Sequence, residues 1–114
     1  MSEKAQELIN TMVGKINDVP DLSVDWGQAV IFHFLDVDQA FRIKFAMDGK
    51  VEKVEKGALK LLLKKGVKAT FSSTSSVIES ILDKTVDLRT VLASGAMKVE
   101  GDDGAIKIVA MAFL

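Results

Sequence analysis

Cysteine and tyrosine are absent from this chain of 114 residues, and proline and histidine occur once each. Without cysteine the chain has no disulfide framework, no thiolate nucleophile and no cysteine-based metal site, a pattern compatible with a reducing cytoplasm. A serine hydrolase needs a histidine base beside its nucleophile, but the single histidine, His33, lies in an apolar stretch and no Gly-x-Ser-x-Gly motif is present. We therefore expect a cytoplasmic protein that is not an enzyme, with no catalytic residue, metal or cofactor.

The chain also lacks an excess of either charge and any long apolar run. Its 15 basic and 16 acidic residues give a net charge of −1, so no overall positive field favours nucleic acid. A membrane-spanning helix needs about 20 apolar residues, and the polar start, residues 1–7, has no signal-peptide core. With 48% hydrophobic residues, the chain is expected to form one soluble domain, residues 1–114.

The first half predicts a helix and three strands. Apolar residues recur every three or four positions from Ala5 to Ile16, as in an amphipathic helix. Trp26 to Leu35 is apolar on both faces, as in a covered strand, and Phe41 to Met47 alternates apolar with polar residues. Asp48-Gly49 is a hairpin turn signal, and Lys50 to Lys56 suits an exposed edge strand.

The second half predicts one further strand followed by two short helices. Lys68 to Ser72 alternates as a strand does. Ser76 stands three residues before Glu79, the spacing of a capping box, and an apolar run comes next. Asp87 is placed to cap a second helix that would end at Gly95, which can adopt the left-handed conformation.

The end of the chain is the most apolar part. Ala96 to Glu100 predicts a fifth strand, and Asp102 is placed to cap a final helix. From Ala105 to Leu114 the only side chain that is not apolar is Lys107. A helix there would have no polar, solvent-exposed face and should be buried on nearly every side. The secondary structure of residues 57–66 is left open. The lysines near Lys64 are interpreted as solvated, with contact to lipid headgroups as the alternative.

Strands joined by tight turns and flanked by helices predict an α+β domain. We expect a five-stranded, mainly antiparallel sheet with helices packed on one face.

The order and spacing of several segments resemble the second half of the sterol carrier protein type 2 domain family. The segments are Lys68-Ala69-Thr70-Phe71, Ile81-Leu82, Asp87-Leu88, Val91-Leu92 and Gly95-Ala96-Met97-Lys98-Val99-Glu100-Gly101-Asp102. Two positions depart from the family pattern: Ala96 stands where a lysine is usual, and Lys84 stands where a glycine commonly separates the two short helices.

This resemblance implies an apolar tunnel between sheet and helices that takes up a fatty acid, an acyl-CoA, a sterol-like molecule or a polyisoprenoid. It leaves open whether the protein transfers its ligand or only holds it. The residues expected to line the tunnel are Phe32, Phe34, Phe41, Ile43, Phe45, Phe71, Ile78, Ile81, Leu82, Leu88, Val91, Leu92, Met97, Val99, Ile106, Val109, Ala110, Met111 and Phe113.

Two alternatives stay open beside this prediction. Phe41, Ile43, Phe45 and Phe71 each have a sufficient role as plain core. The apolar final segment could instead be the surface through which an accessory domain forms a homodimer or docks on a lipid or quinone metabolism complex. Transient membrane contact is also compatible with a lipid-binding role.

Overall fold

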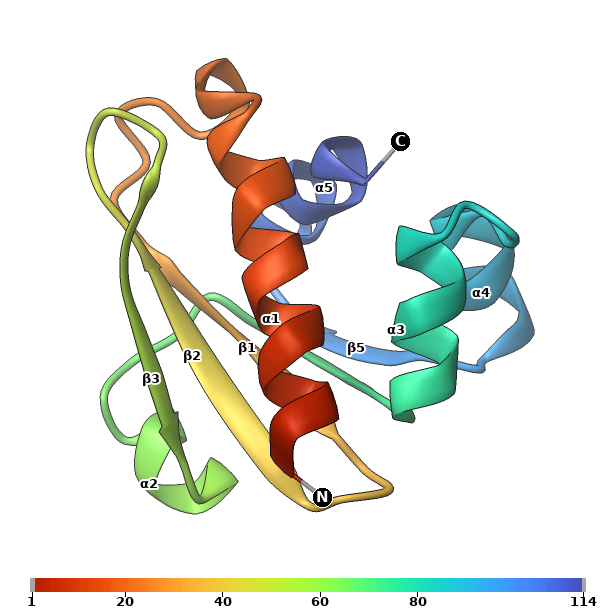
Figure 1. Cartoon of the computed structure of the whole chain (residues 1–114). Helices are drawn as coiled ribbons and strands as arrows, with labels where there is room; N and C mark the ends of the chain where they lie inside the picture. The colour runs from red at the N-terminus through yellow and green to blue at the C-terminus, as the bar shows by residue number, and fades with distance from the viewer. Residues whose placement is uncertain (1, 114) are drawn as a thin grey trace.

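The structure is a computed structural model that describes residues 2–113, without the side chains of Ser2 and Glu3. Its elements, in chain order (Figure 1), are α1 (Ser2–Asn17), η1 (Pro20–Leu22), β1 (Ala29–Phe34), β2 (Gln39–Phe45), β3 (Val51–Gly57), α2 (Leu59–Leu63), β4 (Ala69–Ser73), α3 (Ser75–Leu82), α4 (Leu88–Ser94), β5 (Lys98–Gly101) and α5 (Asp103–Ala112). All five predicted strands are present, although the first is shorter than expected because Trp26 lies in the turns before it.

The strands form one sheet in the order β3-β2-β1-β4-β5. Neighbouring strands are antiparallel except β1 and β4, which are parallel and bring Phe32 beside Phe71. The α+β class and the mainly antiparallel sheet are confirmed. β1 and β4 can pair in parallel because they are joined by a long excursion through β2, β3 and α2.

Alternation along the strands separates the two faces of the sheet. Val30, Phe32 and Phe34 of β1 face the principal core, while the residues between them point to the opposite face. Helix α1 crosses the core face, with Ile9 and Met12 buried under it, and α5 packs beside it on the same face (Figure 1). The main core therefore lies between the sheet and α1, α3, α4 and α5.

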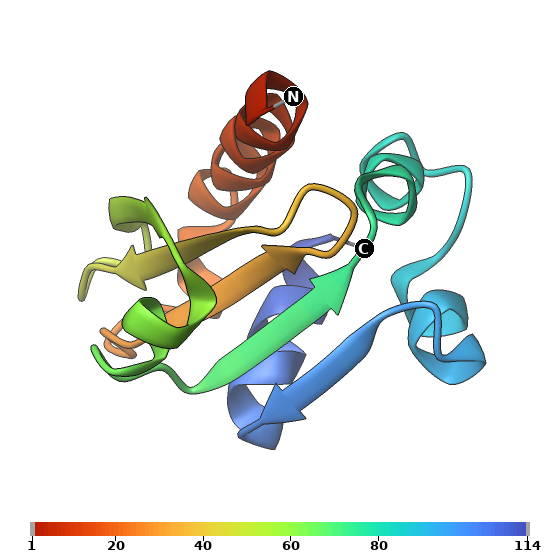
Figure 2. The same cartoon turned by 90° about the horizontal axis from the view of Figure 1, so that it is seen from below.

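Helix α2 is the exception to the expectation that helices pack on one face. It covers the opposite face, where Leu62 is buried against Ile31 and Ala40, and Figure 2 shows it on the near side of the strands with α5 on the far side. Its C-terminal end is held by Glu55 of β3, which pairs with Arg42 and with Lys65. Residues 57–66, left open by the sequence, thus form the end of β3, a five-residue helix and a turn.

The predicted Asp48-Gly49 turn is present and packs against the chain after α1. Gly49 has a left-handed φ of 91°, and a Cβ there would lie 1.9 Å from the carbonyl oxygen of Pro20. Ser23 Oγ donates to the Gly49 carbonyl oxygen at 2.8 Å, and the Val51 amide donates to Asn17 Oδ1 at 2.8 Å. Glycine is required here because the backbones of two segments touch.

Two of the three predicted helix starts are confirmed. Asp87 accepts a hydrogen bond from the Arg89 amide at 2.8 Å, and Asp102 accepts one from the Ala105 amide at 3.1 Å. Gly95 ends α4 with a left-handed φ of 80°, as expected.

The predicted capping box of α3 is wrong. The helix begins one residue earlier than Ser76, and its first amide, that of Ser75, donates to Asp36 Oδ1 in the β1–β2 turn. Glu79 pairs with Lys4 of α1 instead of turning back to the helix start. A carboxylate from a distant turn therefore replaces the local cap.

The apolar final segment is less buried than its sequence predicts. Ala105 and Val109 of α5 are buried, whereas Ile108 is half-buried and Met111 is 44% exposed. The helix packs along one side only, because α1 and the sheet cover one stripe of it. Leu114 lies outside the described residues.

Candidate functional site

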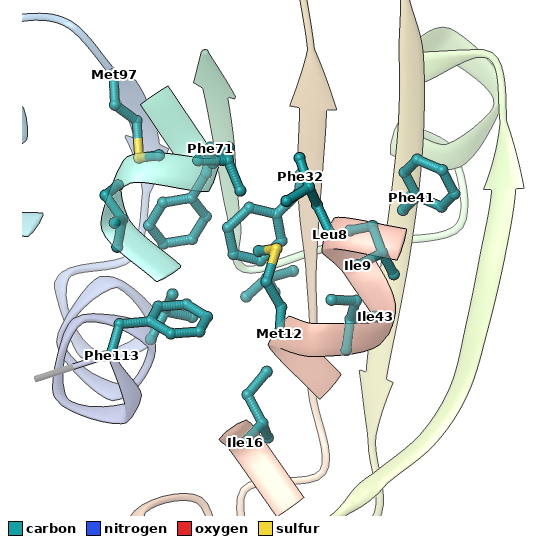
Figure 3. Packing of buried hydrophobic residues seen from close by; sticks show 14 of the residues in the cluster. Leu8, Ile9, Met12, Ile16, Phe32, Phe41, Ile43, Phe71, Met97 and Phe113 are labelled. Carbon is teal, nitrogen blue, oxygen red and sulfur yellow. The ribbon is translucent and has the colours of Figure 1, made fainter. Parts of the chain in front are cut away.

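The space between sheet and helices is a small cavity of about 10 Å³ with no polar lining. Its walls come from α1, β1, β4, α3, α4, the chain before β5 and α5, which place there Met12, Phe32, Phe71, Ile78, Ile81, Leu82, Leu88, Met97, Val109 and Phe113. Figure 3 shows several of these side chains converging from both layers. A cavity of this size has room for about one water molecule, and an apolar lining offers that water no partner.

Aromatic rings form much of the wall. Phe32 and Phe71, brought side by side by the parallel strand pair, stack with their centroids 4.9 Å apart. Phe113 meets Phe32 edge to face at 6.5 Å. Met12 and Met97 complete the wall, and unbranched methionine adapts to changes in the shape of a cavity at low cost.

The predicted tunnel is not open among the described residues. Ligand pockets for small molecules have volumes of about 300–1,000 Å³, far above this cavity. The side chains that would line a tunnel instead pack against one another, and Phe32, Phe71 and Val109 are almost completely inaccessible to solvent. A lipid could enter this space only if the helices move away from the sheet.

A second hollow, of about 480 Å³ and open to solvent, lies directly outside this cavity. Ile81 and Phe113 line both spaces and so form the partition between them. Phe113 is only 9% exposed and follows the last turn of α5. Moving these two side chains would join the cavity to the surface.

The rim of the outer hollow is polar and carries both positively and negatively charged side chains. It is formed by the α3–α4 connection and the start of α4, with Lys84, Asp87 and Arg89 among its residues. Hydrogen bonds from the Arg89 amide and guanidinium hold the pKa of Asp87 below its usual range, so this carboxylate is charged at neutral pH. A passage opened here would therefore run from a charged rim to an apolar interior.

The turn between α3 and α4 contains Lys84, one of the two departures from the family pattern. Lys84, where a glycine is common, has a left-handed φ of 61°, a conformation that glycine adopts without strain. The lysine therefore keeps the turn between α3 and α4 at a conformational cost.

The predicted lining residues divide into two groups. Nine of them form the wall of the cavity: Phe32, Phe71, Ile78, Ile81, Leu82, Leu88, Met97, Val109 and Phe113. The others lie elsewhere in or against the principal core or, for Met111, on the surface: Phe34, Phe41, Ile43, Phe45, Val91, Leu92, Val99, Ile106, Ala110 and Met111. Phe41, Ile43 and Phe45 belong to β2, next to the edge strand β3, and so lie away from the cavity, which is at β1 and β4.

Met12 is the wall residue that the sequence analysis missed. Its place on the apolar stripe of α1 marked it as buried, but the stripe alone gives no sign that this turn of the helix lies opposite the parallel strand pair. Only the crossing of α1 over the sheet places Met12 there (Figure 3).

His33 lies away from the cavity. It belongs to the opposite face of β1, and its Nε2 lies 3.1 Å from Asp38 Oδ1 across the turn. In residues 2–113 no group of histidine and acidic side chains could hold a metal ion, and no helix is long and apolar enough to cross a membrane.

No protein-family model matches the chain, and no curated protein matches it in sequence. Solved structures do resemble it. A crystal structure of sterol carrier protein 2 gives a TM-score of 0.66 over 93% of this chain and 87% of that one, at 11% identity. A ubiquinone synthesis protein, UbiJ-SCP2, gives 0.60 over 97% and 89% of the two chains, at 16% identity. At these identities the likeness shows a shared fold, so the chain has the sterol carrier protein 2 fold.

The same fold occurs as part of a much larger protein. The inverting sec-alkylsulfatase Pisa1 from a Pseudomonas species gives a TM-score of 0.65 at 21% identity over 82% of this chain. This chain spans 13% of the sulfatase.

Proposed function

We propose that this protein binds an apolar lipid tail between the sheet and helices α3 to α5 and has no chemistry of its own. The observation that carries the proposal is the wholly apolar cavity, which shares Ile81 and Phe113 with the lining of an open hollow. The fold that this chain shares with sterol carrier protein 2 also supports a lipid-binding role.

The energetics allow such binding even though the cavity is small. Transfer of an acyl chain of roughly 15 methylenes out of water is worth at most about 12 kcal/mol, at about 0.8 kcal/mol each, before the costs of association and ordering. Part of that free energy would separate α3, α4 and Phe113 from the sheet. The tail would then lie against Phe32 and Phe71, with its polar head at the charged rim.

This geometry supports a broad class of lipid ligand. An apolar interior with a polar rim suits a fatty acid, an acyl-CoA, a sterol-like molecule or a polyisoprenoid, and the absence of polar groups in the cavity wall predicts selection by length and shape. Transient contact with a membrane would supply such a ligand and is part of the proposal.

Lipid extraction is the direct test. Protein purified from its native host should yield a stoichiometric lipid in mass spectrometry of a solvent extract, and palmitic acid should displace a fluorescent apolar dye. Met97→Trp would fill the cavity and should weaken dye binding at least about fivefold, since overpacking a core costs about 1–3 kcal/mol. Met47→Trp, at a methionine that is 60% exposed, is the matched control and should leave dye binding unchanged. Absence of both extracted lipid and dye binding would overturn the proposal.

A second function is supported by a different observation. Met111 and Val86 leave apolar surface exposed near Phe113, which suits an accessory domain that docks on an enzyme complex or forms a homodimer. The fold shared with a ubiquinone synthesis protein supports this alternative. Met111→Asp should then abolish self-association or partner binding and leave dye binding intact, whereas the lipid-binding proposal predicts no effect on either.

A further inference from the structure

The sheet face that carries α2, which we call the α2 face, is far more basic than the chain as a whole. Strand register, helix α2 and the turn after it place eight cationic side chains on this face: Arg42, Lys44, Lys53, Lys60, Lys64, Lys65, Lys68 and Lys98. The carboxylates that register and contacts place there are three: Asp38, Glu55 and Glu100. Glu52 stands at the bulge between β2 and β3. Since the chain has a net charge of −1, its remaining residues are net acidic.

These cations are only partly neutralised within the protein. Glu55 pairs with Arg42 and Lys65 and lies 3.7 Å from Lys53. Lys44 Nζ donates to the carbonyl oxygens of Gly27 and Phe45, at 2.7 and 3.1 Å, and these uncharged acceptors do not offset its positive charge. The sequence contains no acidic residue between Glu55 and Glu79.

Helix α2 adds apolar side chains at the centre of this basic face. Because Leu62 points into the sheet and successive residues turn by about 100°, Leu61 and Leu63 flank the helix while Lys60 and Lys64 point outward. Leu61 is 60% exposed and Leu63 is 44% exposed. Two open hollows of about 280 and 270 Å³ lie beside the helix, the second lined by Arg42, Lys44, Lys65 and Lys68.

We infer that the α2 face docks on a membrane surface rich in anionic phospholipids. The lysines meet lipid phosphates, Leu61 and Leu63 enter the headgroup region, and the basic hollow accepts a headgroup. Nucleic acid is the other polyanion that a basic face could bind. Proteins that bind single-stranded nucleic acid stack its bases on exposed aromatic side chains. Here all six phenylalanines and the one tryptophan belong to or pack against the principal core, on the opposite side of the sheet.

Docking on this face is independent of the proposed lipid cavity. The sheet separates the α2 face from α3, α4 and α5, so a docked molecule keeps its cavity helices turned away from the bilayer (Figure 2). This docking is therefore distinct from the transient membrane contact that would supply a ligand to the cavity. A failure of docking therefore leaves the proposed ligand binding unaffected, and the reverse also holds.

Vesicle flotation with the full chain tests the inference. The protein should float with vesicles made of equal parts phosphatidylcholine and phosphatidylglycerol, but not with phosphatidylcholine alone, and salt should release it. Each lysine near an anionic bilayer contributes about fivefold to the affinity, so Lys60→Glu with Lys64→Glu should weaken binding more than about tenfold. The control is Lys56→Glu with Lys107→Glu, which makes the same change in net charge at two exposed lysines off this face.

Four results would overturn the inference. They are equal binding to both kinds of vesicle, equal losses in the two double variants, tighter binding of a DNA oligonucleotide than of anionic vesicles at the same salt, and full binding by Leu61→Ser with Leu63→Ser. Circular dichroism and dye binding should be unchanged in every variant, which would show that the fold and the cavity are intact.

Discussion

Asp36 and Ser75 lie 39 positions apart in the chain, yet Asp36 Oδ1 accepts hydrogen bonds from both the amide and the hydroxyl of Ser75, at 2.9 and 3.0 Å. Asp36 stands in the turn after β1, and Ser75 is the first residue of α3. The contact joins the parallel strand pair to the helix that borders the cavity. It therefore serves both as a helix cap and as a tie between layers.

Asp36→Ala should lower the free energy of unfolding by about 1 kcal/mol at neutral pH, because the first amide of α3 loses its acceptor. Partial desolvation raises the pKa of Asp36, but the hydrogen bonds from Ser75 outweigh it and the net pKa is lowered. A lowered pKa in the folded state means that the charged form stabilises the fold above the unfolded value of about 3.9, and that this contribution is lost as the pH falls through the folded pKa. Urea denaturation should show the wild type and Asp36→Ala converging below about pH 4.

The matched control for this prediction is Asp18→Ala, at an exposed carboxylate after α1. It should change stability by less than about 0.5 kcal/mol at either pH. A constant gap between wild type and Asp36→Ala at all pH values would show that the Asp36 contribution does not depend on its charge.

Phe113→Ala should open the partition between the cavity and the outer hollow. Loss of the buried ring should lower the free energy of unfolding by about 3 kcal/mol. Because the ring no longer has to be displaced, uptake of a fluorescent fatty acid, measured by stopped-flow, should become at least about tenfold faster. Met111→Ala, two residues earlier and exposed, should leave the rate unchanged. An unchanged rate in Phe113→Ala would mean that the ligand enters by another route.

Gly49→Ala should lower the free energy of unfolding by more than about 2 kcal/mol. The new Cβ would meet the Pro20 carbonyl oxygen at 1.9 Å, and the left-handed backbone adds its own cost. Gly14→Ala is the informative comparison, since a Cβ in α1 at that position meets nothing within 4 Å. There the same change should stabilise the protein by about 0.5–1 kcal/mol. Thermal unfolding of the two variants should therefore shift in opposite directions.

Lys84→Gly should stabilise the fold by about 0.5 kcal/mol, because release of the left-handed strain exceeds the added entropy of a glycine in the unfolded chain. Lys107→Gly, inside α5, should instead cost about 1 kcal/mol. Chemical denaturation measures both. A loss of stability in Lys84→Gly would show that contacts of the lysine side chain outweigh the strain.

Local patterns in the sequence were sufficient for most of the elements. The spacing of apolar residues identified α1, alternation identified the strands, and Asp87, Gly95 and Asp102 marked helix ends correctly. These signals succeed because a cap or a periodic stripe involves residues within about four positions of one another. The α3 cap was predicted wrongly for the same reason, since its acceptor comes from another part of the chain.

Three properties were decided only by the tertiary structure. The volume of the cavity depends on sub-ångström packing between side chains of seven segments, so the same apolar residues are compatible with an open tunnel or a nearly solid core. The position of α2 on the opposite face depends on the route of the chain after β3. The basic α2 face depends on strand register, which separates charges that nearly cancel in the sequence as a whole. Local sequence patterns thus determined an α+β domain and composition its large apolar content, whereas the packing of the chain determined where its apolar and charged surfaces lie.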